Sequence, residues 1–102
     1  MVKTIKSEDF FALTENQEKP FVLDFTADWW PSCRHLGPVV SSVAEQLDSV
    51  DFYKVDVDEA PDLAQRFGVQ SIPTLILIKD GQEAKRSVGF IPEEPVKEFA
   101  QS

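Results

Sequence analysis

Short apolar runs alternate with amphipathic stretches along the chain, and this alternation limits the possible folds more than any other feature of the sequence. Strands are predicted at residues 21–25, 52–57, 74–78 and 84–88, the third of them after a turn at Ile72-Pro73. Helices are predicted at residues 7–13, 33–47, 58–67 and 92–101. Strands joined through a helix lie parallel, whereas the Asp80-Gly81 pair is typical of a tight hairpin between antiparallel strands. With a first strand placed before the first helix, the order is β-α-β-α-β-α-β-β-α. The sequence therefore predicts an α/β fold, with a mixed sheet of about five strands and about four helices on both its faces.

The longest predicted helix, residues 33–47, contains the pair Gly37-Pro38. Apolar residues follow a helical spacing on both sides of this pair. Because proline removes one backbone hydrogen bond and clashes with the preceding turn, we expect the helix to bend there.

Chain length and charge restrict the class of protein. With 102 residues, we expect a single domain over residues 1–102. The chain has 18 Asp and Glu against 10 Lys and Arg, a formal net charge of −8, which repels nucleic-acid phosphates and anionic lipids. We therefore expect no nucleic-acid partner and no membrane partner. The acidic excess either serves solubility or forms a docking face for a basic partner.

The predicted compartment rests on three further features. The apolar stretch at residues 74–78 is far shorter than the ~20 residues of a membrane span. Residues 1–6 lack the apolar core of a signal peptide. A single cysteine excludes a structural disulfide framework within the chain. The sequence therefore predicts a cytoplasmic protein, which we expect to be a monomer.

The segment Trp29-Trp30-Pro31-Ser32-Cys33 follows the first buried strand and contains the only cysteine. A dithiol C-x-x-C centre exchanges electrons by closing and opening a disulfide within one chain. Its attacking thiol would stand three residues before Cys33, where this chain has Trp30. One cysteine cannot close that ring.

Other chemistry at this segment is limited by the small number of ligands. His35 is the only histidine, and we expect it on the surface because it does not share a helix face with Cys33. One cysteine and one histidine supply no zinc or iron–sulfur ligand set within the chain, so we expect no metal and no cofactor.

Taken in order, several segments resemble the thioredoxin family over nearly the whole chain. They are the strand and turn at 22–29, the Trp30-Pro31-Ser32-Cys33 motif, Pro38, the strand at 54–58, the segment 67–74 with Pro73, and the glycines Gly81 and Gly89. Each is a weak signal alone, but their order and spacing together are specific.

The resemblance implies a thiol-disulfide oxidoreductase that reduces disulfide-containing proteins and is recharged by a thioredoxin reductase. In this family the first cysteine of the motif attacks a substrate disulfide from a helix N-terminus, where thiolate is favoured. The second cysteine then releases the mixed disulfide. Cys33 matches this second, resolving thiol, and Trp30 replaces the attacker, so we expect the dithiol activity to be lost.

Two further residues are implied to act on Cys33. The resemblance makes Asp24 a buried proton acceptor for the resolving thiol, assisted by Lys54 on the adjacent strand. The alternatives are that Asp24 is exposed at a strand edge and that Cys33 is only a small buried apolar residue. An unpaired carboxylate inside an apolar strand is unstable or stays protonated, so Asp24→Ala or Asp24→Asn is expected to stabilise the fold.

The family also implies a substrate groove. Pro73 is expected to form a cis peptide after Ile72 and to present that backbone to an extended peptide, with Gly89 alongside. Trp29 and Pro31 are expected on the substrate-facing surface. The alternatives are an ordinary turn proline at Pro73 and a core position for Trp29.

Trp30 beside Trp29 predicts an exposed aromatic pair. It is either an engineered substitution in an otherwise competent redox protein or the natural residue of a family member that binds rather than reduces. Asp24, Lys54, Pro73 and Gly89 favour the first explanation, because they match an intact redox site. The alternative function is a non-catalytic module that holds an extended peptide or partner protein in the groove of Trp29, Trp30 and Pro73.

Overall fold

The structure is a computed structural model and describes residues 2–102. Its elements are β1 (Lys3–Thr4), α1 (Ser7–Glu15), β2 (Phe21–Thr26), α2 (Pro31–Gln46), β3 (Asp51–Asp56), α3 (Pro61–Arg66), β4 (Thr74–Lys79), β5 (Gln82–Val88) and α4 (Glu93–Gln101). Within this part of the chain the strands form one sheet in the order β1-β3-β2-β4-β5. β1 and β2 pair with β3 in parallel, whereas β4 is antiparallel to both β2 and β5. The predicted mixed α/β sheet is confirmed.

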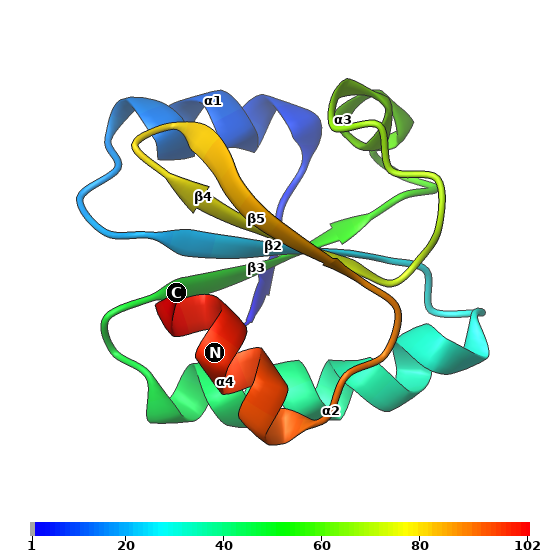
Figure 1. Cartoon of the computed structure of the whole chain (residues 1–102). Helices are drawn as coiled ribbons and strands as arrows, with labels where there is room; N and C mark the ends of the chain where they lie inside the picture. Colours follow the sequence, from blue (N-terminus) through cyan, green and yellow to red (C-terminus); the bar gives the residue numbers. More distant parts are fainter. Residues whose placement is uncertain (1) are drawn as a thin grey trace.

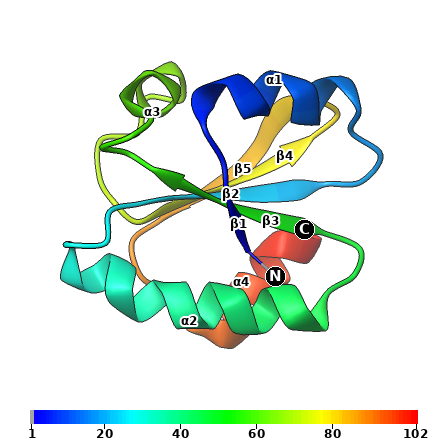
Figure 2. The same ribbon diagram turned by 180° about the vertical axis from the view of Figure 1, so that it is seen from behind.

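Two helices cover each face of the sheet. α1 and α3 lie on one face and α2 and α4 on the other, as Figure 1 and the reverse view in Figure 2 show. Each face has its own apolar core: one joins Phe10, Phe21, Phe25 and Leu63, and the other joins Val22, Leu36, Val40, Val43 and Val96.

β2 is the central strand, and all six of its residues are buried. Side chains alternate between the faces of a strand, so Phe21, Leu23 and Phe25 enter the core under α1 and α3, whereas Val22 packs toward α2. Asp24 follows the same alternation as Val22. It therefore faces α2, the helix that carries the cysteine.

The turn between the last two strands agrees with the sequence prediction. Asp80 and Gly81 both have positive φ, 52° and 77°, as a two-residue hairpin turn requires. β5 begins at Gln82, two residues before its predicted start.

Two helices start two or more residues away from their predicted start. α2 begins at Pro31 rather than residue 33, because proline suits the first position of a helix; it continues through Pro38. The helix predicted at residues 58–67 begins only at Pro61. The prediction was wrong there because Asp56 holds residues 57–60 in a turn before the helix. The carboxylate of Asp56 accepts a hydrogen bond from the Asp58 amide at 2.9 Å, and its carbonyl accepts one from the Ala60 amide at 2.8 Å.

Candidate functional site

The motif Trp30-Pro31-Ser32-Cys33 lies where the loop after β2 enters α2. Trp30 has an extended backbone (φ −91°, ψ 125°) and stands immediately before the helix. Its carbonyl accepts from the amides of Cys33 and Arg34 at 3.1 and 3.2 Å, which closes the first turn. The predicted nucleophile position therefore lies at a helix N-terminus, where the positive end of the helix dipole stabilises an anion. The indole of Trp30 supplies no such group.

Trp29 and Trp30 form an aromatic pair on the surface. Their rings meet edge to face, with centroids 5.4 Å apart and planes at 85°. Trp29 is 62% exposed and Trp30 is 42% exposed, so neither belongs to the core. The indole Nε1 of Trp29 donates to Asp58 Oδ2 at 2.7 Å, which fixes the orientation of this ring.

Cys33 is the third residue of α2 and lies in its first turn, on the side that faces the sheet. It is a free cysteine with only 5% of its surface exposed. The thiol is therefore shielded from the face of the molecule on which the tryptophans lie.

Asp24 is a buried carboxyl group without a hydrogen-bond partner for Oδ1 among residues 2–102. Only 5% of the residue is exposed, which rules out the strand-edge alternative. Burial raises the pKa of Asp24 from 3.8 to about 7, and the nearby Lys54 ammonium partly offsets this rise.

Lys54 lies directly beside Asp24 in the parallel register of β2 and β3. Its ammonium donates to Asp28 Oδ1 at 2.7 Å, and this hydrogen bond is the main reason that the pKa of Lys54 is raised. Asp28 thus stabilises the charged form of Lys54 beside the cavity that both residues line.

A cavity of about 340 Å³ joins these inner groups. Asp24, Cys33 and Lys54 all line it, together with Thr26, Asp28, Arg34, Gly37, Val40, Ser41, Val2 and Thr4. Trp29, Trp30 and Pro73 do not line it. The site therefore has an aromatic surface half and a polar inner half.

Three of the predicted groove residues, Ile72, Pro73 and Gly89, meet at the start of β4. The Ile72-Pro73 peptide is cis, and the carbonyl of Pro73 accepts from the Gly89 amide at 2.8 Å. Pro73 itself is buried, whereas Ile72 is half-buried. Gly89 has φ +93°, a conformation that strongly favours glycine. Its neighbours Val88 and Phe90 are exposed, so apolar side chains flank the cis-proline.

Sequence reasoning gave no role to four residues of the site: Asp28, Asp58, Val88 and Phe90. Asp28 and Asp58 act through contacts with residues more than 25 positions away, which no local pattern reveals. Val88 and Phe90 flank Gly89, and that adjacency is the signal that points to them.

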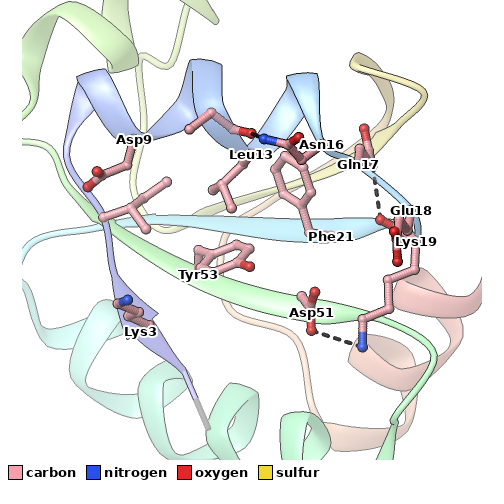
Figure 3. Close-up of a pocket in the computed structure, with 12 residues that line it drawn as sticks. Lys3, Asp9, Leu13, Asn16, Gln17, Glu18, Lys19, Phe21, Asp51 and Tyr53 are labelled. Atoms are coloured by element: carbon pink, nitrogen blue, oxygen red, sulfur yellow. Dashed lines mark hydrogen bonds and ion pairs between the residues drawn. The ribbon is translucent and has the colours of Figure 1, made fainter.

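A second, larger cavity of about 740 Å³ lies on the other side of the sheet, between α1, β1 and β3. Figure 3 shows Leu13, Phe21 and Tyr53 inside it and the ion pair of Lys19 and Asp51, at 3.1 Å, on its rim. None of the predicted site residues lines this cavity.

Two general findings complete the description. Among residues 2–102, no helix is long and apolar enough to cross a membrane. In the same part of the chain, no group of three or more His, Cys, Asp and Glu side chains is placed to bind a metal ion.

The fold and site together define a class of α/β proteins in which a cysteine motif opens a helix near a cis-proline loop. The family model described as thioredoxin matches residues 1–102. The chain belongs to the thioredoxin family. It has one cysteine, Cys33, and no C-x-x-C pair.

Relatives from distant organisms agree with this assignment. The chain is 40% identical to thioredoxin-1 of Saccharomyces cerevisiae, over 90% of this chain and 89% of that protein. It is 37% identical to thioredoxin of Bacillus subtilis, over 93% and 92%. It is 38% identical to thioredoxin H2 of Arabidopsis thaliana, over 84% of this chain and 65% of the relative.

Solved structures show the same fold. Chloroplastic thioredoxin z superposes with a TM-score of 0.88 at 32% identity, covering 98% of this chain and 91% of that one. Thioredoxin of Malassezia sympodialis superposes with a TM-score of 0.87 at 36% identity, covering 99% and 90%. Membership of the family supports a thioredoxin-like redox function.

Proposed function

We propose that this chain is a thioredoxin-type protein-disulfide oxidoreductase in which dithiol activity is lost because Trp30 occupies the position of the attacking cysteine. The observation that carries this proposal is the single cysteine, which lies at the resolving position of the motif. An indole has no nucleophilic thiol, so no mixed disulfide with a substrate forms at residue 30.

The rest of the site supports a retained redox scaffold. Asp24 and Cys33 line one cavity, and the raised pKa of Asp24, about 7, suits a group that accepts a proton near neutral pH. Lys54 limits that rise by its charge. In this proposal Asp24 is the proton acceptor for the Cys33 thiol, and Lys54 positions and tunes it.

The proposed substrate surface consists of Trp29, Pro31, Ile72, Pro73 and Gly89. Trp29 is exposed and oriented by Asp58, and the cis-proline loop is tied to Gly89 by one backbone hydrogen bond. An extended segment of a disulfide-containing protein would lie across this surface. By family membership, a thioredoxin reductase is the proposed electron donor, and a monomer in the cytoplasm is the proposed working form.

Reduction of insulin disulfides by dithiothreitol tests the proposal. The chain is expected to give no acceleration, and Trp30→Cys is expected to restore it, because an attacking thiol then stands at the N-terminus of α2. Trp30→Ala is the matched control, since it removes the indole without supplying a thiol, and it is expected to stay inert. An inert Trp30→Cys variant that folds normally would refute the proposed redox ancestry.

A second candidate function is a non-catalytic module that binds an extended peptide or a partner protein. The exposed edge-to-face pair of Trp29 and Trp30 favours it, because large apolar side chains at a surface are frequent at binding sites. Partner capture with Trp30→Ala tests it, with the exposed Phe11 on α1 changed to alanine as the control. If the chain is a binding module, the capture of a partner is lost in Trp30→Ala and kept in the Phe11→Ala control.

A further inference from the structure

We propose that Cys33 is oxidised from inside the molecule: the cavity between β2 and α2 admits hydrogen peroxide, which converts the Cys33 thiol to a sulfenic acid. This reaction goes beyond the proposed disulfide chemistry, since it needs no attacking thiol at residue 30.

The cavity provides a route for a small oxidant to reach the Cys33 thiol. Only 5% of Cys33 is exposed, yet the residue lines a cavity of about 340 Å³. Cys33, Gly37 and Ser41 are spaced four residues apart on α2, so they form one continuous helix face along that cavity. A water molecule occupies about 30 Å³ in the liquid, and hydrogen peroxide is only slightly larger, so the cavity has room for it.

Gly37 lines the same cavity, and because it has no side chain it keeps this route open. Gly37 is half-buried, and a Cβ atom at this position would meet no heavy atom within 4 Å apart from those of its chain neighbours and its own helix backbone. Any larger residue here would project from the same helix face as Cys33. The absence of a side chain at Gly37 therefore leaves free space beside the thiol.

The unpaired carboxyl oxygen of Asp24 favours a small guest in the cavity. Asp24 lines the cavity, and its buried Oδ1 has no partner among the described residues. A buried polar atom without a partner is unfavourable, so this position favours a small guest that donates a hydrogen bond. Hydrogen peroxide donates and accepts hydrogen bonds, and Lys54 and Arg34 add positive charge to the wall that receives it.

The reaction balances without another group. The Cys33 sulfur attacks one peroxide oxygen, the O–O bond breaks and an S–O bond forms. Sulfur is oxidised by two electrons, and the second peroxide oxygen leaves as hydroxide. The thiol proton passes to Asp24 and then to this hydroxide, which departs as water. With no other cysteine in the chain, the sulfenic acid forms no internal disulfide, and it persists until an external thiol reduces it or a second peroxide oxidises it to the sulfinic acid.

Two matched variants test the route. Purified native protein is treated with hydrogen peroxide for a fixed time and the peroxide is removed with catalase. The protein is then unfolded in urea that contains dimedone, and the sulfenic acid adduct is measured by intact mass. Gly37→Leu fills the cavity beside the thiol and is expected to slow trapping by about tenfold, because reactivity follows access to the sulfur. Trp30→Ala removes an indole that does not line the cavity, and it is expected to leave the rate nearly unchanged. The opposite pattern, or native protein that gives no adduct while urea-unfolded protein does, would overturn the proposal.

A measurement on the unaltered chain tests the route even if the Gly37→Leu variant misfolds. Rates are compared for hydrogen peroxide, tert-butyl hydroperoxide and cumene hydroperoxide, each divided by its rate with free cysteine. A cavity route predicts a steep fall with oxidant size. Equal normalised rates would show that the oxidant reaches Cys33 through open solvent, and the proposal would then be wrong.

Discussion

Asp24 lies in the middle of β2, between β3 and β4, with the cavity between β2 and α2 on one side. Its pKa, about 7 in the folded protein against 3.8 for the free group, couples folding to pH. Between these two values the folded state holds more protons than the unfolded state, so the free energy of unfolding falls as pH rises through this window. A difference of about 3 pKa units corresponds to at most about 4 kcal/mol. This is the loss in the free energy of unfolding that ionised, buried Asp24 causes above pH 7.

Replacing this carboxyl group is therefore expected to stabilise the protein at neutral and alkaline pH. Asp24→Asn keeps the shape and removes the charge, and we expect a gain of about 1–4 kcal/mol at pH 8 that shrinks toward pH 4. Urea unfolding at both pH values measures it. Asp28→Asn is the control, because its exposed ion pair with Lys54 is worth about 1 kcal/mol or less. A loss of stability in Asp24→Asn would mean that the carboxylate has a stabilising partner.

The orientation of Trp29 gives a second prediction at this scale. Its Nε1 donates to Asp58 at 2.7 Å, so Asp58→Ala is expected to free the ring. Because the contact is exposed, the expected loss of stability is only about 0.5–1.5 kcal/mol. Near-ultraviolet circular dichroism should lose intensity in this variant, since a mobile indole contributes less. An unchanged spectrum would show that the packing of Trp30 alone holds the ring.

Individual elements were predictable from the sequence where one local signal acts alone. β2 is apolar on both faces because helices cover it on both sides, and the Asp80-Gly81 turn needs two positive φ values that these residues tolerate. The start of α3 was missed because the side chain of Asp56 competes for the same backbone amides. The position of Cys33 on α2 followed from spacing, whereas the cavity beside it required the packing of α2 against β2.

The side chain of Gln17, in the loop after α1, ties the turn of the β4–β5 hairpin to the rest of the fold. The amide of Gln17 donates to Ile78 O at 2.9 Å and to Lys19 O at 3.2 Å, and its oxygen accepts from the Gly81 amide at 2.7 Å. Gln17→Ala is expected to lower the free energy of unfolding by about 1–3 kcal/mol, because partly buried backbone groups lose their partner. Hydrogen exchange of the Gly81 amide should also accelerate. Gln82→Ala, at an exposed position in the same hairpin, should change neither quantity.

The whole molecule buries its only thiol, and this sets its behaviour under oxidising conditions. Cys33 is out of reach of a second protein chain, so treatment with diamide is expected to leave a monomer by light scattering and non-reducing electrophoresis. Lys85→Cys, on the exposed edge strand β5, is the control and should give a reducible dimer. A reducible dimer of the unaltered chain would mean that α2 opens far enough to expose Cys33.

Both tryptophans of the chain belong to the edge-to-face pair at the entrance to α2. Fluorescence excited selectively in the indole band therefore comes from this one place on the molecule. Anything that covers the pair alters the emission, whereas a ligand in the cavity of Figure 3, on the opposite side of the sheet, leaves it nearly constant. The tryptophan pair that precedes α2 thus gives the protein a label-free optical reporter of binding at this part of its surface.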